Sequence, residues 1–198
     1  ILGSVVPALT GRVLGALRMF CSARFLTVGP GLKSGIKLRL DNPAQLGAEL
    51  LCGAVAALEE GPGPLAVISA DTAISIMAVN GKQELVGGVI LPGPQLSLSA
   101  LVQKTAQLPQ IDLSAPASSS ILGKNTSACL QNGFVLGTAG LLDGLAERFQ
   151  AELGPDIRFY ATGNLPRTIR EACRTPIQYR EYLITDGLYR IWQKNRKG

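Results

Sequence analysis

The chain has 198 residues, of which 46% are hydrophobic and 17% are charged, and its formal net charge is +5. This length and composition are typical of a globular protein with one large or two small domains, not of a disordered chain. The sequence contains no histidine, which excludes Ser-His catalytic triads, His-ligated metals and imidazole acid–base chemistry. No apolar run approaches the roughly 18 unbroken residues that a membrane span requires, so we expect no membrane partner.

Four cysteines are widely spaced and form no Cys-x-x-Cys pair: Cys21, Cys52, Cys129 and Cys173. Most of them have apolar neighbours in the sequence, so we expect buried, reduced thiols in a cytoplasmic protein, with neither a disulfide framework nor a zinc site.

The basic residues near the C-terminus are expected to be a solvated helix end, and nucleic acid is not an expected partner. They are Lys194, Arg196 and Lys197.

The first third of the chain is predicted to hold two helices. An apolar run at 1–6 precedes a helical pattern at 7–20, and a strand is expected at 25–28. The second helix is predicted from Asp41 to Glu60, because Asp41-Asn42-Pro43 supplies a capping side chain and a proline for the first turn. The run Gly61-Pro62-Gly63-Pro64 ends this helix and predicts a boundary between domains at 1–62 and 63–198.

The segment from Leu65 to Pro94 is predicted to form a β-hairpin. Its first strand, 65–79, is apolar on both faces, and Asn80-Gly81 is typical of a type I′ turn, in which both central residues have positive φ. Asp71 interrupts this strand, and a buried carboxylate needs a partner, solvent or a cation. Asp71 therefore indicates either a cleft or the end of a hairpin, and an Asp satisfied by backbone amides near a bend is the simpler alternative.

The rest of the chain alternates helices and strands. Helices are predicted at 94–108, 123–153, 166–173 and 186–195, with a strand at 156–161 and a turn at 162–164. Within the long helix, Gly133, Gly137, Gly140 and Gly144 need a packing reason, because each weakens a helix by about 1 kcal/mol relative to Ala. A second helix is expected to approach them, within this chain or from another copy. The alternation predicts an α/β fold with helices layered on a sheet.

Several motifs, in this order and spacing across nearly the whole chain, resemble those of type III pantothenate kinases. They are Val28-Gly29-Pro30-Gly31-Leu32-Lys33-Ser34-Gly35, Asp41-Asn42-Pro43, Gly87-Gly88-Val89-Ile90-Leu91-Pro92-Gly93, residues 104–109 and Gly123-Lys124-Asn125-Thr126. The resemblance implies two ribonuclease-H-like domains of the actin-like ATPase fold, with nucleotide bound between them.

The family resemblance also implies an activity. Its members are homodimers that phosphorylate pantothenate with ATP, the first step of coenzyme A synthesis, and they use Mg²⁺ and a monovalent cation, K⁺ or NH₄⁺. By resemblance, Thr126 contacts pantothenate, Asn80-Gly81 reaches toward the nucleotide phosphates, and the Gly87–Gly93 run lies at the dimer interface. The turn Thr162-Gly163 corresponds to the place of the adenosine.

The expected pantothenate pocket departs from the family pattern. The family motif Gly-x-Asp-Arg, in which Asp is the catalytic base and Arg holds the substrate, is here Gly47-Ala48-Glu49-Leu50. Glu49 replaces the Asp with a carboxylate whose side chain is one methylene longer, whereas Leu50 replaces the charged Arg with an uncharged side chain. The family's Tyr just before Asp-Asn-Pro is Leu40 here. We expect substrate binding by this set together with Thr126, and impaired catalysis, because phosphoryl transfer depends on positioning and electrostatics.

The expected nucleotide and cation site departs as well. Where the family has Asp-Phe-Gly-Thr-Ala, this chain has Ser69-Ala70-Asp71-Thr72-Ala73. Thr72 is retained, Ser69 replaces the cation-binding Asp, and Asp71 stands two residues on, toward the same side of an extended strand. Asp71 either binds the cation in place of the missing ligand or repels the nucleotide phosphates. We favour repulsion, which would impair nucleotide binding. Asn164 replaces the second glycine after Thr-Gly and narrows the adenosine site.

The beginning of the chain departs from the family most strongly. The family starts with an Asp-x-Gly-Asn-Thr phosphate loop, and this chain opens in the segment that follows it, Gly3-Ser4-Val5-Val6-Pro7. We therefore expect an incomplete first domain that lacks part of the phosphate cradle. Two alternatives are a non-catalytic, dimeric regulatory relative with an accessory role in transcription, and an incomplete product of a competent enzyme's gene.

Overall fold

The computed structural model describes residues 1–29, 31–115, 117 and 120–196, so Pro30 and Lys197 lie outside the described residues. The fold is mixed α/β, as predicted, and is built on a six-stranded sheet in the order β1-β4-β3-β2-β5-β6. The strands are β1 (Lys37–Leu38), β2 (Leu65–Ala70), β3 (Ala73–Val79), β4 (Glu84–Pro92), β5 (Arg158–Gly163) and β6 (Ile177–Tyr179).

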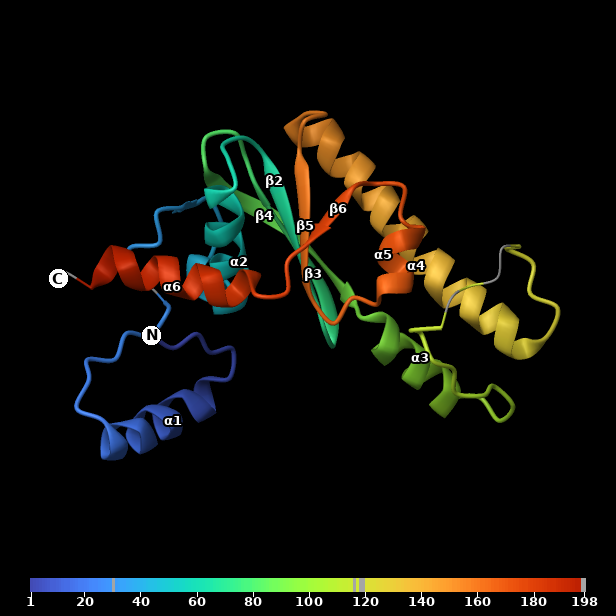
Figure 1. Cartoon of the computed structure of the whole chain (residues 1–198), viewed down its shortest axis with the longest axis horizontal. Helices are drawn as coiled ribbons and strands as arrows, with labels where there is room; N and C mark the ends of the chain where they lie inside the picture. Colours follow the sequence, from blue (N-terminus) through green and yellow to red (C-terminus); the bar gives the residue numbers. More distant parts are fainter. Residues whose placement is uncertain (30, 116, 118–119, 197–198) are drawn as a thin grey trace.

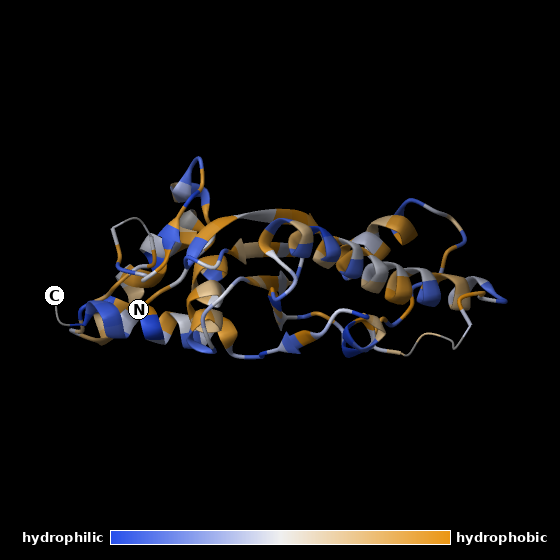
Figure 2. Cartoon of the chain, turned by 90° about the horizontal axis from the view of Figure 1, so that it is seen from above, coloured by the Kyte–Doolittle hydropathy of each residue, from blue (hydrophilic) through white to orange (hydrophobic). Residues whose placement is uncertain are grey.

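Helices cover both faces of this sheet (Figure 1). Helices α2 (Ala48–Glu59) and α6 (Leu183–Asn195) pack on one face, and α4 (Thr126–Leu153) and α5 (Arg167–Ala172) pack on the other. Strand β2 is buried at every position, which explains its apolar sequence on both faces. Hydrophobic residues accordingly concentrate along the central strands (Figure 2). Helix α3 (Pro94–Gln103) continues from the end of β4.

Strand directions place several loops at one edge of the sheet. Strands β2, β5 and β6 are parallel to one another, whereas β2, β3 and β4 form an antiparallel meander. The carboxyl ends of β2, β5 and β6 therefore meet at the same edge. In open α/β sheets, ligands bind outside the carboxyl ends of the parallel strands.

The predicted hairpin is present, but it has one more strand than expected. The segment 65–79 is not one strand: it turns at Asp71–Thr72 between β2 and β3. Of the two possibilities for Asp71, the end of a hairpin is therefore the one observed. The second turn also differs from the type I′ prediction, because Gln83, with φ of 59°, is the residue with positive φ. Asn80 Oδ1 accepts hydrogen bonds from the amides of Lys82 and Glu84, which fixes this longer turn.

The N-terminal third follows the prediction only in part. The helix predicted at 7–20 is present as α1 (Pro7–Phe20), which projects away from the sheet (Figure 1). The strand expected at 25–28 is reduced to a single parallel bridge between Leu2 and Thr27. The helix predicted from Asp41 to Glu60 is interrupted: a short 3₁₀ turn, η1 (Pro43–Gln45), precedes α2, because Leu46 and Gly47 are extended.

The glycines of α4 do not pack against another helix. A Cβ added at Gly133, Gly137, Gly140 or Gly144 would meet no described atom within 4 Å. Of the two alternatives, a close approach by a helix of this chain is therefore not observed among the described residues. The four glycines leave an open stripe along this helix.

The prediction of buried thiols holds for one cysteine. Cys52 is fully buried in α2, where desolvation raises the pKa of its thiol to about 12. Cys173 is partly buried, with its pKa raised to about 11 by burial and by Asp143. Cys21 and Cys129 are exposed, because they lie at the end of the projecting α1 and in the first turn of α4. All four thiols are free.

Within the described ranges, no helix is both long and apolar enough to cross a bilayer.

Candidate functional site

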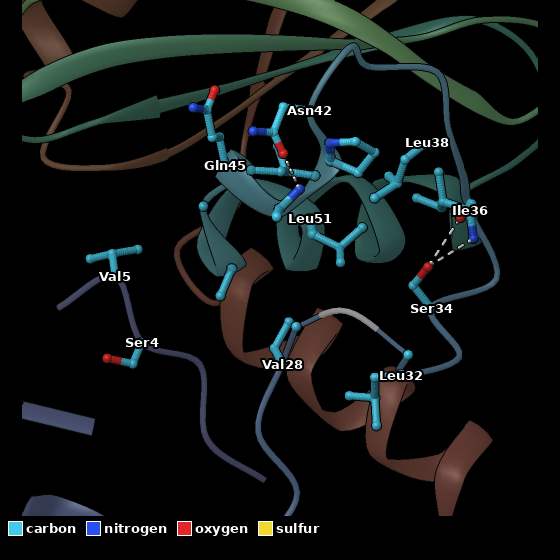
Figure 3. Close-up of a pocket in the computed structure, with 17 residues that line it drawn as sticks. Ser4, Val5, Val28, Leu32, Ser34, Ile36, Leu38, Asn42, Gln45 and Leu51 are labelled. Atoms are coloured by element: carbon cyan, nitrogen blue, oxygen red, sulfur yellow. Dashed lines mark hydrogen bonds between the residues drawn. The ribbon is translucent and has the colours of Figure 1, made fainter. Parts of the chain in front are cut away.

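The first turn of α2 borders a cavity of about 770 Å³. Gly47 is the N-cap of this helix, and it lines the cavity together with Ala48. The opposite wall is the segment from Val28 to Leu38, which includes the predicted glycine-rich loop. In Figure 3, Leu51 of α2 and Val28 lie on either side of this space. Two residues of the expected pantothenate pocket are therefore in a cavity large enough for a small molecule.

Glu49 lies beside this cavity, not inside it. Its half-buried side chain borders a smaller cavity of about 180 Å³, between α2, α6 and the N-terminal segment. Ser4, Val5 and Ala48 line both cavities, so the two are adjacent. Glu49 is the acidic residue in the first turn of α2, a position at which the helix dipole favours a carboxylate.

The other expected residues of this pocket have different surroundings. Leu50 is buried, with 7% of its surface exposed, and it belongs to the hydrophobic core under α2. Leu40 is partly buried against the same core. An apolar side chain at position 50 packs inward, so the change from the family's Arg adds to the core and leaves no charge at the cavity.

Thr126 is in another part of the chain. It is the first residue of α4 and lines an apolar cavity of about 330 Å³ between α3 and α4, with neighbours such as Leu101 and Cys129. Figure 1 shows the start of α4 and the helix α2 at opposite ends of the molecule. One chain therefore does not bring Thr126 to Gly47 and Glu49.

The expected nucleotide-binding residues do come together, at the carboxyl edge of the sheet. Thr72 follows β2, and Gly163 ends β5 beside Ala70. Gly163 has a φ of 82° and lies against the Ala70 carbonyl, so a side chain here would be strained and would clash. The turns after β2 and β5 are joined by hydrogen bonds from Asn164 N to the Ala70 carbonyl and from Asn164 Nδ2 to Asp71 Oδ1, the latter at 2.9 Å. The bond from Gly93 N to Thr72 O at 2.9 Å ties the end of β4 to the turn after β2.

A row of hydroxyl groups crosses three strands next to this edge. Ser69 on β2 is the cross-strand neighbour of Ser75 on β3 and of Thr162 on β5. All three are buried, on the face of the sheet that α2 and α6 cover. Thr162 Oγ1 donates a hydrogen bond to the Glu181 carbonyl at 3.4 Å. Sequence reasoning missed Ser75, because it placed residues 65–79 in one strand.

Tyr179 supports the turn after β5 from the opposite face. Its hydroxyl donates a hydrogen bond to the Gly163 carbonyl at 2.9 Å. The Arg170 guanidinium lies 3.9 Å from the centre of the Tyr179 ring, a cation–π contact that holds the ring in place. Neither residue was indicated by the sequence analysis, since nothing in the sequence relates α5 and β6 to this turn.

The arrangement therefore has two separate candidate regions. One is the neutral cavity at the start of α2, and the other is the hydroxyl-rich edge after β2 and β5. No group of three or more carboxylate and thiol side chains that could hold a metal ion is found among the described residues. A cation at the second region would thus depend on hydroxyl and backbone oxygens with the single carboxylate of Asp71.

Comparison with known proteins identifies the family. The family model described as type III pantothenate kinase matches residues 1–148. The solved structure of a conserved putative Baf family transcriptional activator from Campylobacter jejuni has a similar fold. Its TM-score is 0.57 at 19% identity, over 98% of this chain and 82% of that one.

Curated relatives agree with the family model. The type III pantothenate kinase of Koribacter versatilis is 36% identical over 196 residues, which is 99% of this chain and 71% of that protein. That of Dehalococcoides mccartyi strain BAV1 is 38% identical over 99% of this chain and 74% of the relative. With a family match over three quarters of its length and relatives this similar from end to end, the chain belongs to the type III pantothenate kinase family.

Proposed function

We propose that this chain binds pantothenate and ATP and phosphorylates pantothenate slowly, giving 4′-phosphopantothenate. The observation that carries the proposal is the position of Glu49, in the helical turn that also contributes Gly47 and Ala48 to the large cavity. The substrate hydroxyl is proposed to reach the smaller cavity that Glu49 borders, where this carboxylate takes its proton. Glu49 is the proposed general base.

ATP is proposed to bind at the carboxyl edge of the sheet, with Mg²⁺ on its phosphates. Thr72, Thr162 and Gly163 are the proposed nucleotide-binding residues, because the turn that contains Thr72 meets the end of β5 at this edge. A monovalent cation, K⁺ or NH₄⁺, is proposed beside Ser69 and Asp71. Oxygen ligands suit such an ion, and the buried hydroxyl row supplies them.

Slow catalysis is proposed because of two features of the chain. Leu50 lies in the hydrophobic core and supplies no charge to hold the substrate. Asp71 brings a negative charge to the place proposed for phosphates, and its carboxylate is already bound by Asn164. Phosphoryl transfer depends almost entirely on positioning and charge stabilisation, so these features together slow the reaction without preventing ligand binding.

A homodimer is proposed to complete the substrate site. Thr126 begins α4 and Gly47 caps α2, and the start of α4 is well separated from α2 in Figure 1, so contact of both residues with one small substrate would require a second copy. The open glycine stripe of α4 and the exposed Ile90 of β4 offer surfaces for that copy. The domain boundary at residue 62 remains a prediction.

Calorimetric titration tests this function. The full chain is titrated with pantothenate, and then with ATP and Mg²⁺, each with and without K⁺ and NH₄⁺. Binding of both ligands, with ATP binding strengthened by one of the cations, is the expected result. Glu49→Gln is expected to bind pantothenate but not to turn it over, and Glu152→Gln, an exposed change on α4, is the matched control. Absence of binding by both ligands would contradict the proposal and favour a non-catalytic regulatory protein.

A further inference from the structure

One peptide group in the turn after β5 is held at both of its ends. Its carbonyl, that of Gly163, accepts a hydrogen bond from the Tyr179 hydroxyl at 2.9 Å. Its amide, that of Asn164, donates to the Ala70 carbonyl at the end of β2. The turn therefore lies between β2 on one side and β6 on the other, and this peptide group cannot rotate without breaking both bonds.

Glycine at position 163 permits this turn but does not fix it. Its φ of 82° is in the left-handed region, which glycine adopts readily. Glycine adopts other backbone conformations just as readily, so the residue itself leaves the orientation of the peptide group open. The constraint comes from the two hydrogen bonds. Loss of either one is expected to leave a mixture of orientations in the unliganded protein.

The Tyr179 hydroxyl reaches the turn along one face of the sheet. Tyr179 is the last residue of β6 and the cross-strand neighbour of Ala161 on β5. Its ring packs on the hydrophobic cluster that α4 and α5 cover. Residues 161 and 163 of a strand point to the same face, so the hydroxyl extends from its own neighbour to the next residue on that face.

Arg170 on α5 confines the ring of Tyr179. Its guanidinium carbon lies 3.9 Å from the ring centre, and its Nε is buried with no hydrogen-bond partner among the described residues. No carboxylate in the described part of the chain forms an ion pair with Arg170. Its stacking on the ring is thus its main contact, and a stacked guanidinium restricts how far the ring can move.

We propose that Tyr179 is a positioning residue for ATP binding and that Arg170 acts through it. This rests on the proposed function, because it takes the turn with Thr162 and Gly163 as part of the ATP site. The hydroxyl keeps the peptide group in the orientation that the nucleotide meets, and neither side chain needs to touch the ligand. If only a fraction of the molecules has this orientation, the dissociation constant rises by the inverse of that fraction.

Tyr179→Phe tests the proposal, because it keeps the ring and its contact with Arg170 and removes only the hydroxyl. The full chain is titrated calorimetrically with ATP and Mg²⁺, and separately with pantothenate. The dissociation constant of ATP is expected to rise about fivefold, a difference of about 1 kcal/mol. That of pantothenate is expected to be unchanged, because its proposed cavity is at the start of α2. Tyr182→Phe removes the hydroxyl of an exposed tyrosine and is the matched control, with both constants unchanged.

The two ligands separate positioning from a structural role. Unchanged ATP affinity in Tyr179→Phe, with or without a lower melting temperature, would overturn this inference and leave the proposed function intact. Equal losses for ATP and pantothenate would indicate general disturbance of the fold and would also overturn it. If the wild-type chain does not bind ATP, the proposed function fails together with this inference.

A double-mutant cycle tests the part assigned to Arg170. Arg170→Met removes the cation from the ring, and its effect is measured in the wild type and in Tyr179→Phe. The loss of ATP affinity is expected to be about threefold larger in the wild type, because the position of the ring matters only while it carries the hydroxyl. Arg170→Lys keeps a cation near the ring and is expected to restore most of the affinity. Equal losses in the two backgrounds would overturn the role of Arg170.

Discussion

Asn164 Nδ2 donates a hydrogen bond to Asp71 Oδ1 at 2.9 Å, and this contact joins the turn after β5 to the turn after β2. The same turns are tied by the bond from Asn164 N to the Ala70 carbonyl. Asp71 is exposed, so its carboxylate faces the place proposed for the nucleotide. The pair leaves a carboxylate at this edge of the sheet.

Removal of this charge is expected to strengthen nucleotide binding. In Asp71→Asn, the amide oxygen can still accept the bond from Asn164, while the carboxylate charge is lost. Two unit charges about 4 Å apart in water interact by about 1 kcal/mol, so the affinity for ATP is expected to rise about fivefold. Calorimetry without a divalent cation gives the clearest measurement, because no metal then bridges the two anions.

Asp156→Asn is the control for this change. Asp156 is exposed in the turn before β5, and the substitution removes the same charge at the opposite end of that strand. It is expected to leave the affinity for ATP unchanged. A fall in affinity in Asp71→Asn would instead indicate that Asp71 holds a cation for the nucleotide.

Asp143 is expected to be a main support of the loop between α5 and β6. It is 3% exposed, and its carboxylate accepts hydrogen bonds from the amides of Arg174 and Thr175 at 2.9 to 3.0 Å. Asp143→Asn places an NH₂ group against one of these donors. The free energy of unfolding at pH 7 is expected to fall by about 2 kcal/mol, measured by urea denaturation.

The pH dependence of stability follows from the same carboxylate. Burial alone would raise the pKa of Asp143, but the amide hydrogen bonds outweigh it and the pKa is lowered. A lowered pKa in the folded state stabilises the protein above the unfolded pKa of about 3.9, and this contribution is lost as the pH falls further. The deficit of Asp143→Asn is therefore expected to be constant above the unfolded pKa of about 3.9 and to shrink as the pH falls below it. A deficit that does not shrink there would contradict this account.

Two Gly→Ala changes in helices are expected to have opposite effects. At Gly187 in α6, a methyl group would clash with the Cys52 carbonyl of α2. Gly187→Ala is expected to destabilise the chain by about 3 kcal/mol, because these two helices cannot separate without opening the core. At Gly137 in α4, a methyl group meets open space, so Gly137→Ala is expected to stabilise by about 1 kcal/mol. Equal effects of the two changes in thermal denaturation would contradict the packing described.

The glycine stripe also tests the proposed dimer. If a second copy packs on it, Gly137→Leu should weaken self-association at least about tenfold, because the larger side chain prevents close approach. Sedimentation equilibrium measures this directly, with Gln150→Leu on the same helix as the matched control. A wild-type chain that is monomeric at micromolar concentration would contradict the homodimer.

Local signals predicted the elements better than their connections. The apolar runs, Asn80-Gly81 and the proline caps correctly indicated strands, a hairpin and helices. For Asp71 the sequence left a cleft or the end of a hairpin open, because apolar residues continue on both sides of it, and the structure shows the turn between β2 and β3. Whether Gly137 faces another helix or open space depends on tertiary packing, and the local sequence around it does not predict this.

Site residues that are adjacent in the sequence could be predicted together. Residues that only the folded chain brings together could not. Gly47 and Ala48 lie next to Glu49 in the sequence, and the structure keeps them together. The partnership of Ser69 with Ser75 requires the β2–β3 turn, and the bond from Tyr179 to Gly163 requires the order of the parallel strands.

The most direct test of the account is formation of 4′-phosphopantothenate from ATP and pantothenate, followed by mass spectrometry. The wild-type chain is expected to form product slowly, and Glu49→Gln to be at least about a hundredfold slower, as for loss of a general base. Glu152→Gln should match the wild type. Product formation that is unchanged in Glu49→Gln, or no product from a wild-type chain that binds both substrates, would contradict the account.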